Sequence, residues 1–148
     1  MAREMENTKY DCLRLDNQLC FPLYACAKEV VRQYRKPLEQ LNLTYTQYVV
    51  MMVLWEKGSM TEGELGRTIF LDSGTLTPLL KRLEKQGYIS RKRSEDNERK
   101  LLVSLTEEGK ALKESALCVP ADMSGCINLP EEELKTLKYL LDKVLKQF

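Results

Sequence analysis

The sequence predicts a mainly α-helical fold with one small β-hairpin, and two observations carry this prediction. Apolar residues recur at helical spacing along most of the 148 residues, whereas only residues 88–93 and 101–105 are strand-like. The composition, 43% hydrophobic and 30% charged, is ordinary for a globular protein. A chain of this length suits one domain with its own core, so we expect a single domain over residues 1–148.

The first long helix is predicted over residues 15–35. Leu15, Leu19 and Leu23 repeat every four residues, and a second apolar stripe runs beside them. This apolar surface is wider than one contact needs. Pro22 is tolerated only in a first turn, so the helix either starts near Cys20 or bends there.

Three helices are predicted next. Residues 44–56 are apolar enough for a largely buried helix, which the following glycine closes. Thr61 opens a short helix over residues 61–69, because a Glu three positions later completes a capping box. Asp72 then caps a longer helix that runs to residue 86 and stops at a glycine.

A hairpin and two more helices complete the chain. Residues 88–93 and 101–105 are expected to pair, with a charged loop between them. A helix begins at Thr106, and Pro120 is expected to interrupt or bend it. The last helix starts with Pro130 as its first residue, followed by three Glu at its positive end.

Helix, short helix, long helix and hairpin, over about residues 44–105, is the order of a winged helix-turn-helix. The long helix would be the recognition helix in the major groove, and the hairpin a wing beside it. Small side chains at the start of the long helix would let its backbone approach DNA, and the basic side chains would contact phosphates. The predicted DNA contacts are Ser73, Thr75, Thr77, Pro78, Lys81, Arg82, Arg91, Arg93 and Arg99.

A net charge of +1 hides a basic segment. Residues 81–100 hold eight basic and four acidic side chains, a local net charge of +4. Such a block is expected where an element contacts phosphates, although a solvated charged loop has the same composition. The order of helices and hairpin favours DNA.

The chain contains no His and five Cys. Without His, the sequence excludes His-based acid–base catalysis, Ser–His and Cys–His nucleophile pairs, and metal sites built on His. No Cys pair has the spacing of a zinc or redox motif, so we expect no metal, no cofactor and no enzyme. The N-terminus lacks a signal-peptide pattern and no apolar run would span a membrane. We expect a cytoplasmic protein with reduced thiols.

Four stretches carry a family resemblance. They are residues 17–24 (NQLCFPLY), 43–48 (LTYTQY), 71–84 (LDSGTLTPLLKRLE) and 104–109 (SLTEEG). The chain resembles the MarR family and, more narrowly, its organic hydroperoxide resistance regulators, over nearly its whole length. The resemblance implies a homodimer on a palindromic operator, in which helices from about residues 12–40 and 106–148 of two subunits interlock.

The resemblance also implies a redox sensor at Cys20. Its thiolate would be oxidised to a sulfenic acid, which then forms a disulfide or a sulfenamide. Tyr34 and Tyr45 match two sensor-pocket tyrosines and would donate hydrogen bonds to the Cys20 sulfur across the dimer interface. Tyr24 and Tyr48 are expected in the core. The alternative is that Cys20 is a buried interface thiol without a redox role.

A second thiol determines the fate of the sulfenic acid. Some members of this branch have a resolving Cys in the C-terminal half, and Cys126 and Cys118 both lie in that region. We favour Cys126, in the flexible residues 124–126, over Cys118. A low-molecular-weight thiol would cap Cys20 if neither resolves it.

The wing departs from the family pattern. The family's wing usually carries Asp-x-Arg, and here Asn97 stands at the Asp position while Arg99 is kept. Asn97 can still form a hydrogen bond with the wing backbone, so we carry over Arg99 more firmly than Asn97.

Three functions compete. The first is a repressor that senses organic hydroperoxide through Cys20 and then releases its operator. The second is a repressor released by a small aromatic ligand, with Cys20 incidental. A thiol peroxidase-like enzyme is the least favoured, because the chain shows no peroxidase scaffold and a basic wing would have no purpose there.

Overall fold

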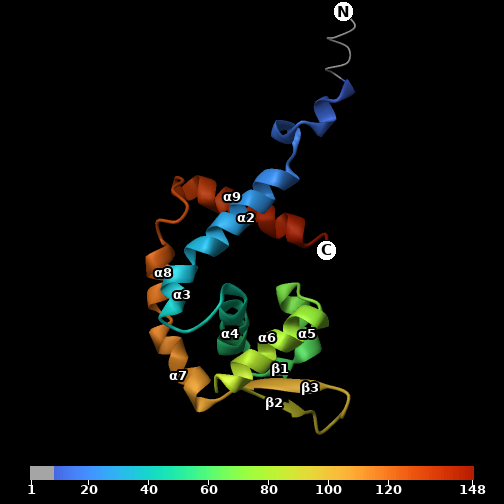
Figure 1. Ribbon diagram of the computed structural model, residues 1–148, viewed down its shortest axis with the longest axis vertical. Helices are drawn as coiled ribbons and strands as arrows, with labels where there is room; N and C mark the ends of the chain where they lie inside the picture. Colours follow the sequence, from blue (N-terminus) through green and yellow to red (C-terminus); the bar gives the residue numbers. More distant parts are fainter. Residues whose placement is uncertain (1–8) are drawn as a thin grey trace, which may run out of the picture.

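The structure is a computed structural model, and it describes residues 9–148. The winged unit consists of α4 (Tyr45–Lys57), β1 (Met60–Thr61), α5 (Glu62–Ile69), α6 (Ser73–Lys85), β2 (Ile89–Arg93) and β3 (Leu101–Leu105). The flanking helices are α2 (Cys20–Gln33), α3 (Arg35–Glu39), α7 (Glu107–Ser115), α8 (Cys118–Met123) and α9 (Glu131–Leu145). The winged unit lies at one end of the molecule, and α2 and α9 lie at the other (Figure 1). Within residues 9–148, no helix is long and apolar enough to cross a membrane.

One hydrophobic core holds the winged unit together with α3 and α8. Helix α4 packs into this core, because its own apolar side chains lie around almost its whole circumference. The largest fully buried side chains are Leu38, Val50, Met51, Leu54, Leu65, Leu76, Leu80, Leu83, Ile89, Val103 and Val119. The predicted order of helix, short helix, long helix and hairpin is confirmed.

The sheet has three antiparallel strands in the order β1-β3-β2. The predicted hairpin is confirmed, with Arg91 opposite Val103. Strand β1 was not predicted. It places Met60 opposite Val103 and Thr61 opposite Leu102, but two residues are too short to show an alternating pattern.

The first long helix begins at Cys20, which was one of the two predicted starts. Residues 11–13 and 15–17 form short 3-10 turns instead of helix. Pro22 is therefore the third residue of α2, where its missing N–H leaves no intrahelical bond unmade. Tyr34 separates α2 from α3, so the predicted helix to residue 35 is also broken near its end.

Two predictions about proline were wrong in detail. The break in the C-terminal region lies at Ala116 and Leu117, and Pro120 occupies the first turn of α8, where proline is tolerated. Pro130 is the residue before α9 instead of its first residue. The acidic first turn of α9 is as predicted.

Helices α2 and α9 have no buried residue in the single chain. Their large exposed apolar side chains are Phe21, Leu23, Tyr24 and Val31 on α2, and Leu137, Tyr139, Leu140, Leu141, Val144 and Leu145 on α9. Helices of this length are marginal in water unless an apolar face is packed. Both helices therefore present a surface that a folded protein normally covers.

Candidate functional site

Cys20 is the first residue of α2, and its side chain is exposed. The preceding residue, Leu19, provides no side-chain cap for the helix. The first N–H groups of a helix are left without intrahelical acceptors, and this end of the helix stabilises negative charge. Cys20 therefore lies beside the unpaired N–H groups at this end of α2.

Tyr34 and Tyr45 lie together, as the sequence predicted. Their ring centroids are 4.8 Å apart. The same aromatic cluster continues from Tyr34 to Tyr48 at 6.0 Å and from Tyr48 to Trp55 at 6.3 Å. Tyr48 is buried as predicted, but Tyr24 is exposed, because α2 extends away from the core. Burial raises the pKa of Tyr34, and the nearby Tyr45 and Cys126 act in the same direction. The Tyr34 phenol therefore keeps its proton and remains a hydrogen-bond donor.

Within one chain, Cys20 does not reach this pair of tyrosines. Cys20 and Tyr34 stand at opposite ends of α2, fourteen residues apart. At the rise of an α-helix this separation is about 20 Å, far beyond hydrogen-bond distance. The structure thus brings Tyr34 and Tyr45 together and leaves Cys20 apart from them.

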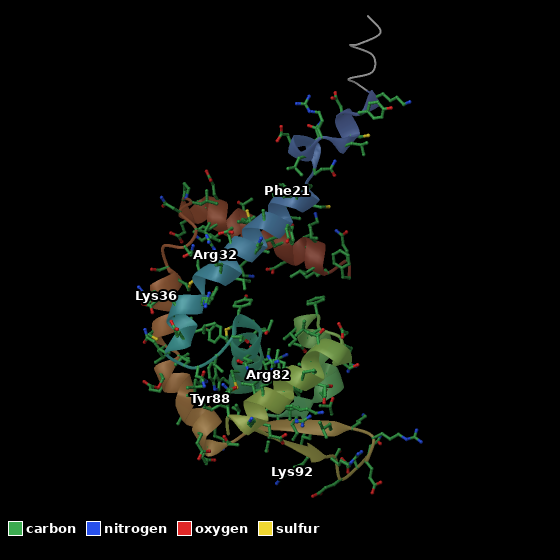
Figure 2. The ribbon with its side chains drawn as sticks, in the orientation of Figure 1. Phe21, Arg32, Lys36, Arg82, Tyr88 and Lys92 are labelled. Atoms are coloured by element: carbon green, nitrogen blue, oxygen red, sulfur yellow. The ribbon has the colours of Figure 1, made fainter. Side chains whose placement is uncertain are left out.

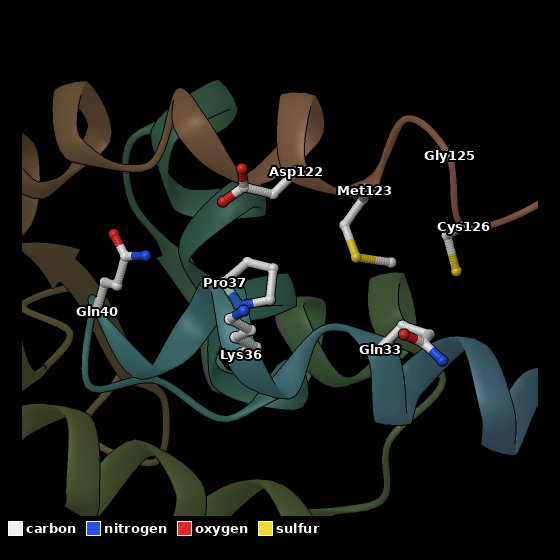
Figure 3. Close-up of a pocket in the computed structure, with 8 residues that line it drawn as sticks. All are labelled: Gln33, Lys36, Pro37, Gln40, Asp122, Met123, Gly125 and Cys126. Atoms are coloured by element: carbon white, nitrogen blue, oxygen red, sulfur yellow. The ribbon is translucent and has the colours of Figure 1, made fainter.

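Cys126 lines a cavity of about 500 Å³ between α2, α3 and the end of α8. The residues around it are Gln33, Lys36, Pro37, Gln40, Asp122, Met123, Gly125 and Cys126. Figure 3 shows the Cys126 side chain pointing toward α2. Gln33, the last residue of α2 before Tyr34, lines the same cavity as Cys126.

Cys118 has a different environment. It is half-buried at the start of α8 and packs against the hydrophobic core. Its Sγ donates a hydrogen bond to the carbonyl oxygen of Ser115 at 3.2 Å. Of the two predicted resolving residues, Cys126 is the one in the cavity.

Helix α6 presents the predicted DNA-facing residues. Its cap, Asp72, accepts hydrogen bonds from the Thr75 backbone N–H at 2.9 Å and from its hydroxyl at 3.2 Å, and these bonds lower the pKa of Asp72. The exposed side chains on this helix include Ser73, Thr75, Pro78, Lys81 and Arg82. Arg82 and Lys92 lie in the part of the molecule away from α2 and α9 (Figure 2).

Thr77 and Arg91, both predicted DNA contacts, bond to carboxylates on a neighbouring helix. The Thr77 hydroxyl donates a hydrogen bond to the Glu62 carboxylate, which joins α6 to α5. The Arg91 guanidinium forms an ion pair with Glu84 of α6 at 2.9 Å. Both side chains are half-buried.

At the tip of the wing, side chains form hydrogen bonds with the wing's own backbone. The Arg99 N–H donates to Oδ1 of Asn97 at 3.0 Å, so Asn97 does bond the wing backbone as predicted. Arg93 Nη1 donates to the carbonyl oxygen of Glu98 at 2.6 Å. The Arg99 side chain is exposed at this tip.

Glu84 was not among the predicted site residues. One signal was available, because Glu84 follows the buried Leu80 by four residues and adjoins the buried Leu83. A carboxylate beside the buried stripe of a helix needs a partner. The pattern could not identify that partner as Arg91.

Comparisons with known proteins agree with this geometry. Residues 32–116 match the family model described as transcriptional regulator SarA/Rot. The organic hydroperoxide resistance transcriptional regulator of Bacillus subtilis is 49% identical over 142 residues, which are 96% of each chain.

Solved structures give the same result. Reduced AbfR bound to DNA is 39% identical, has a TM-score of 0.76, and is matched over 95% of this chain and 98% of that one. AbfR of Staphylococcus epidermidis has also been solved with a disulfide formed. A MarR variant from E. coli in complex with operator DNA is 29% identical, has a TM-score of 0.77, and is matched over 86% of this chain and 93% of that one. The chain therefore belongs to the MarR family of winged helix-turn-helix transcriptional regulators, in the branch of the organic hydroperoxide resistance regulators.

Proposed function

We propose that the protein is a homodimeric repressor that binds a palindromic operator and releases it when an organic hydroperoxide oxidises Cys20. The arrangement of thiols and tyrosines carries this proposal. The rings of Tyr34 and Tyr45 lie 4.8 Å apart at the end of α2 where Gln33 and Cys126 line one cavity, and Cys20 begins the other end of the helix. A second subunit that packs α2 against this one would bring its own Cys20 to the tyrosines.

The uncovered helices support the dimer. Helices α2 and α9 contribute no buried side chain in the single chain and expose Leu, Val and aromatic residues. Covering such faces is the main favourable term in the association of subunits. The proposed interface includes α2, the helix that carries the proposed sensor.

The chemistry at Cys20 needs a thiolate and a hydroperoxide. The thiolate sulfur attacks the terminal oxygen of the hydroperoxide, the O–O bond breaks, and the alcohol leaves after taking up a proton. Cys20 is then a sulfenic acid, in which sulfur has lost two electrons to the peroxide. The thiol of Cys126 from the partner attacks this sulfur, which forms a disulfide and releases water.

A hydrogen-bonded path joins the tyrosines to the recognition helix. Tyr45 is the first residue of α4, and its cap Thr44 exchanges hydrogen bonds with Gln47. The Gln47 side chain donates to Gln86 at the end of α6. Movement of Tyr45 on oxidation would therefore reach α6 and change how the two winged units fit the operator.

Operator binding before and after peroxide treatment tests the proposal. The wild-type protein should bind DNA from its own promoter region and release it after cumene hydroperoxide is added. Cys20→Ser should bind and stay bound, while Cys26→Ser, a matched change at another exposed thiol on α2, should respond like the wild type. Release that persists in Cys20→Ser would favour a small aromatic ligand or another signal instead.

Non-reducing gels identify the resolving thiol. Oxidised wild-type protein should migrate as a covalent dimer, and Cys126→Ser should lose that dimer while Cys118→Ser keeps it. A dimer that survives Cys126→Ser would overturn the assignment. A monomer whose mass increases by that of an added thiol would show that a low-molecular-weight thiol caps Cys20.

A further inference from the structure

Arg91 and Glu84 form the most complete ion pair of the winged unit. Arg91 Nη2 and Nε donate to Oε2 of Glu84 at 2.9 and 3.1 Å, and the Arg91 backbone N–H donates to Oε1 at 3.1 Å. The Arg91 side chain is only 14% exposed and that of Glu84 is 38% exposed. One carboxylate therefore accepts three hydrogen bonds from one residue.

This pair joins the recognition helix to the base of the wing. Glu84 lies in the last turn of α6, and Arg91 is the middle residue of β2. Strand β2 is at the edge of the sheet, where backbone N–H groups that face away from β3 have no strand to pair with. Glu84 satisfies one of these N–H groups and holds the guanidinium as well.

The geometry gives Arg91 a role different from that of its basic neighbours. Lys81, Arg82 and Lys92 are exposed and make no ion pair in the described part of the chain. Two of the guanidinium N–H groups of Arg91 are directed at a carboxylate. A phosphate contact would have to compete with two charge-assisted hydrogen bonds from the guanidinium to Oε2 of Glu84.

We propose that Arg91 is a positioning residue, not a phosphate contact: its pair with Glu84 fixes the wing against the recognition helix. The pair thereby fixes the position of the wing, with the exposed Arg99 at its tip, relative to the exposed face of α6. Both surfaces can then contact the same DNA duplex. This inference rests on the proposed operator binding and revises the expectation, drawn from the order of the elements and the basic wing, that Arg91 contacts DNA.

Removing the negative charge of Glu84 distinguishes the two roles by the sign of the effect. If Arg91 positions the wing, Glu84→Gln should weaken operator binding about tenfold, because the ion pair is lost. If Arg91 contacts phosphate, Glu84→Gln should tighten binding, because a carboxylate near DNA disappears and the guanidinium becomes free. Glu95→Gln, which removes an exposed carboxylate of the wing loop with no ion pair in the described part of the chain, is the control for the loss of one negative charge.

Salt dependence provides a second readout. In a plot of log affinity against log salt, Arg91→Gln should weaken binding but keep the wild-type slope, whereas Lys81→Gln should reduce the slope by about one unit. Arg91→Lys keeps the charge but loses the planar fork, so it should bind as weakly as Arg91→Gln. A reduced slope in Arg91→Gln, or wild-type affinity in Arg91→Lys, would overturn the inference.

The experiment separates this inference from the proposed function. If the wild type binds no promoter DNA, the proposed function fails, and the pair is still tested by amide hydrogen exchange. Exchange in residues 89–93 should be faster in Glu84→Gln than in the wild type, while urea unfolding shows that the variant remains folded. Unchanged exchange would show that the pair does not hold the wing.

Discussion

The buried side chain of Gln47 donates a 3.3 Å hydrogen bond to Oε1 of Gln86, the residue that ends the recognition helix. Gln47 is 5% exposed, and its own Oε1 accepts the Thr44 backbone N–H at 2.8 Å. Gln86 in turn donates to the carbonyl oxygen of Asn42 at 2.7 Å. The loop before α4 and the end of α6 are therefore tied through one buried amide.

Replacing this amide should destabilise the protein. In Gln47→Leu, the Thr44 N–H and Gln86 Oε1 lose their partner, so we expect a loss of about 1–3 kcal/mol in the free energy of unfolding. Urea unfolding at neutral pH measures it. Gln86→Ala, at a half-buried position, should cost less, and an equal or larger cost there would contradict this ranking.

Gly109 is required where α7 crosses the strand region. A Cβ at this position would lie 1.9 Å from the Tyr88 carbonyl oxygen, which is backbone and cannot turn aside. Trp55 Nε1 also donates to the Gly109 carbonyl oxygen at 2.8 Å. Gly109→Ala should lower the free energy of unfolding by about 3 kcal/mol or more, and Trp55 fluorescence during urea unfolding measures this loss.

The matched control for this change is Gly63→Ala in α5. There the nearest atom to a new Cβ is the flexible end of Arg67 at 3.6 Å. Because alanine is the better helix former, this variant should match or slightly exceed the wild type, by up to about 1 kcal/mol. A similar loss in both variants would point to a general intolerance of Cβ atoms instead of the Tyr88 clash.

Arg82 should contribute a direct phosphate contact. It is exposed on α6 and, unlike Arg91, has no carboxylate partner in the described part of the chain (Figure 2). Arg82→Gln should weaken binding to all DNA sequences alike and lower the salt slope by about one unit. Lys135→Gln on α9 is the charge-matched control, and the same reduced slope in that variant would refute a local contact.

Acid should weaken the cap of the recognition helix. Hydrogen bonds from Thr75 hold the pKa of Asp72 below its ordinary value, so the folded state binds a proton less readily than the unfolded state. The stabilisation is complete above the unfolded pKa of about 4 and is lost as pH falls through the lower folded pKa.

Urea midpoints at a series of pH values check this linkage. Asp72→Asn keeps a capping oxygen without the charge, so its midpoint should fall less than that of the wild type as the pH drops from about 5 to about 2. Asp96→Asn, in the exposed wing loop, serves as the comparison. Equal slopes in the wild type and Asp72→Asn would refute the role of the cap.

Local signals in the sequence predicted most of the fold. Thr61 and Asp72 each cap a helix as predicted, because a cap is a contact between residues three apart and is visible as a spacing. The sequence does not show that Arg91 pairs with Glu84, because this contact depends on how β2 packs against α6. Pro120 shows a similar limit: proline is accommodated both at a break between helices and in a first turn, and the structure places the break at Ala116 and Leu117.

The candidate site also has features that the sequence predicts and contacts that it does not. The place of Cys20 in a first turn is confirmed in the structure. The family resemblance implies one pocket for Tyr34 and Tyr45, and their rings lie 4.8 Å apart, while their hydrogen bonds to Cys20 stay a prediction. The inward direction of Thr77 depends on Glu62, fifteen residues away on another helix. Contacts of this kind become readable only when the two helices have been placed side by side.

The bare apolar faces of α2 and α9 also have a thermodynamic consequence. If the dimer covers them, folding and association are one equilibrium, and the melting temperature should rise with protein concentration. Leu141→Asp on α9 should abolish this rise, while Lys138→Ala on the same helix should preserve it. The number of copies in a cell would then set how much of the protein is folded as well as how much operator is occupied.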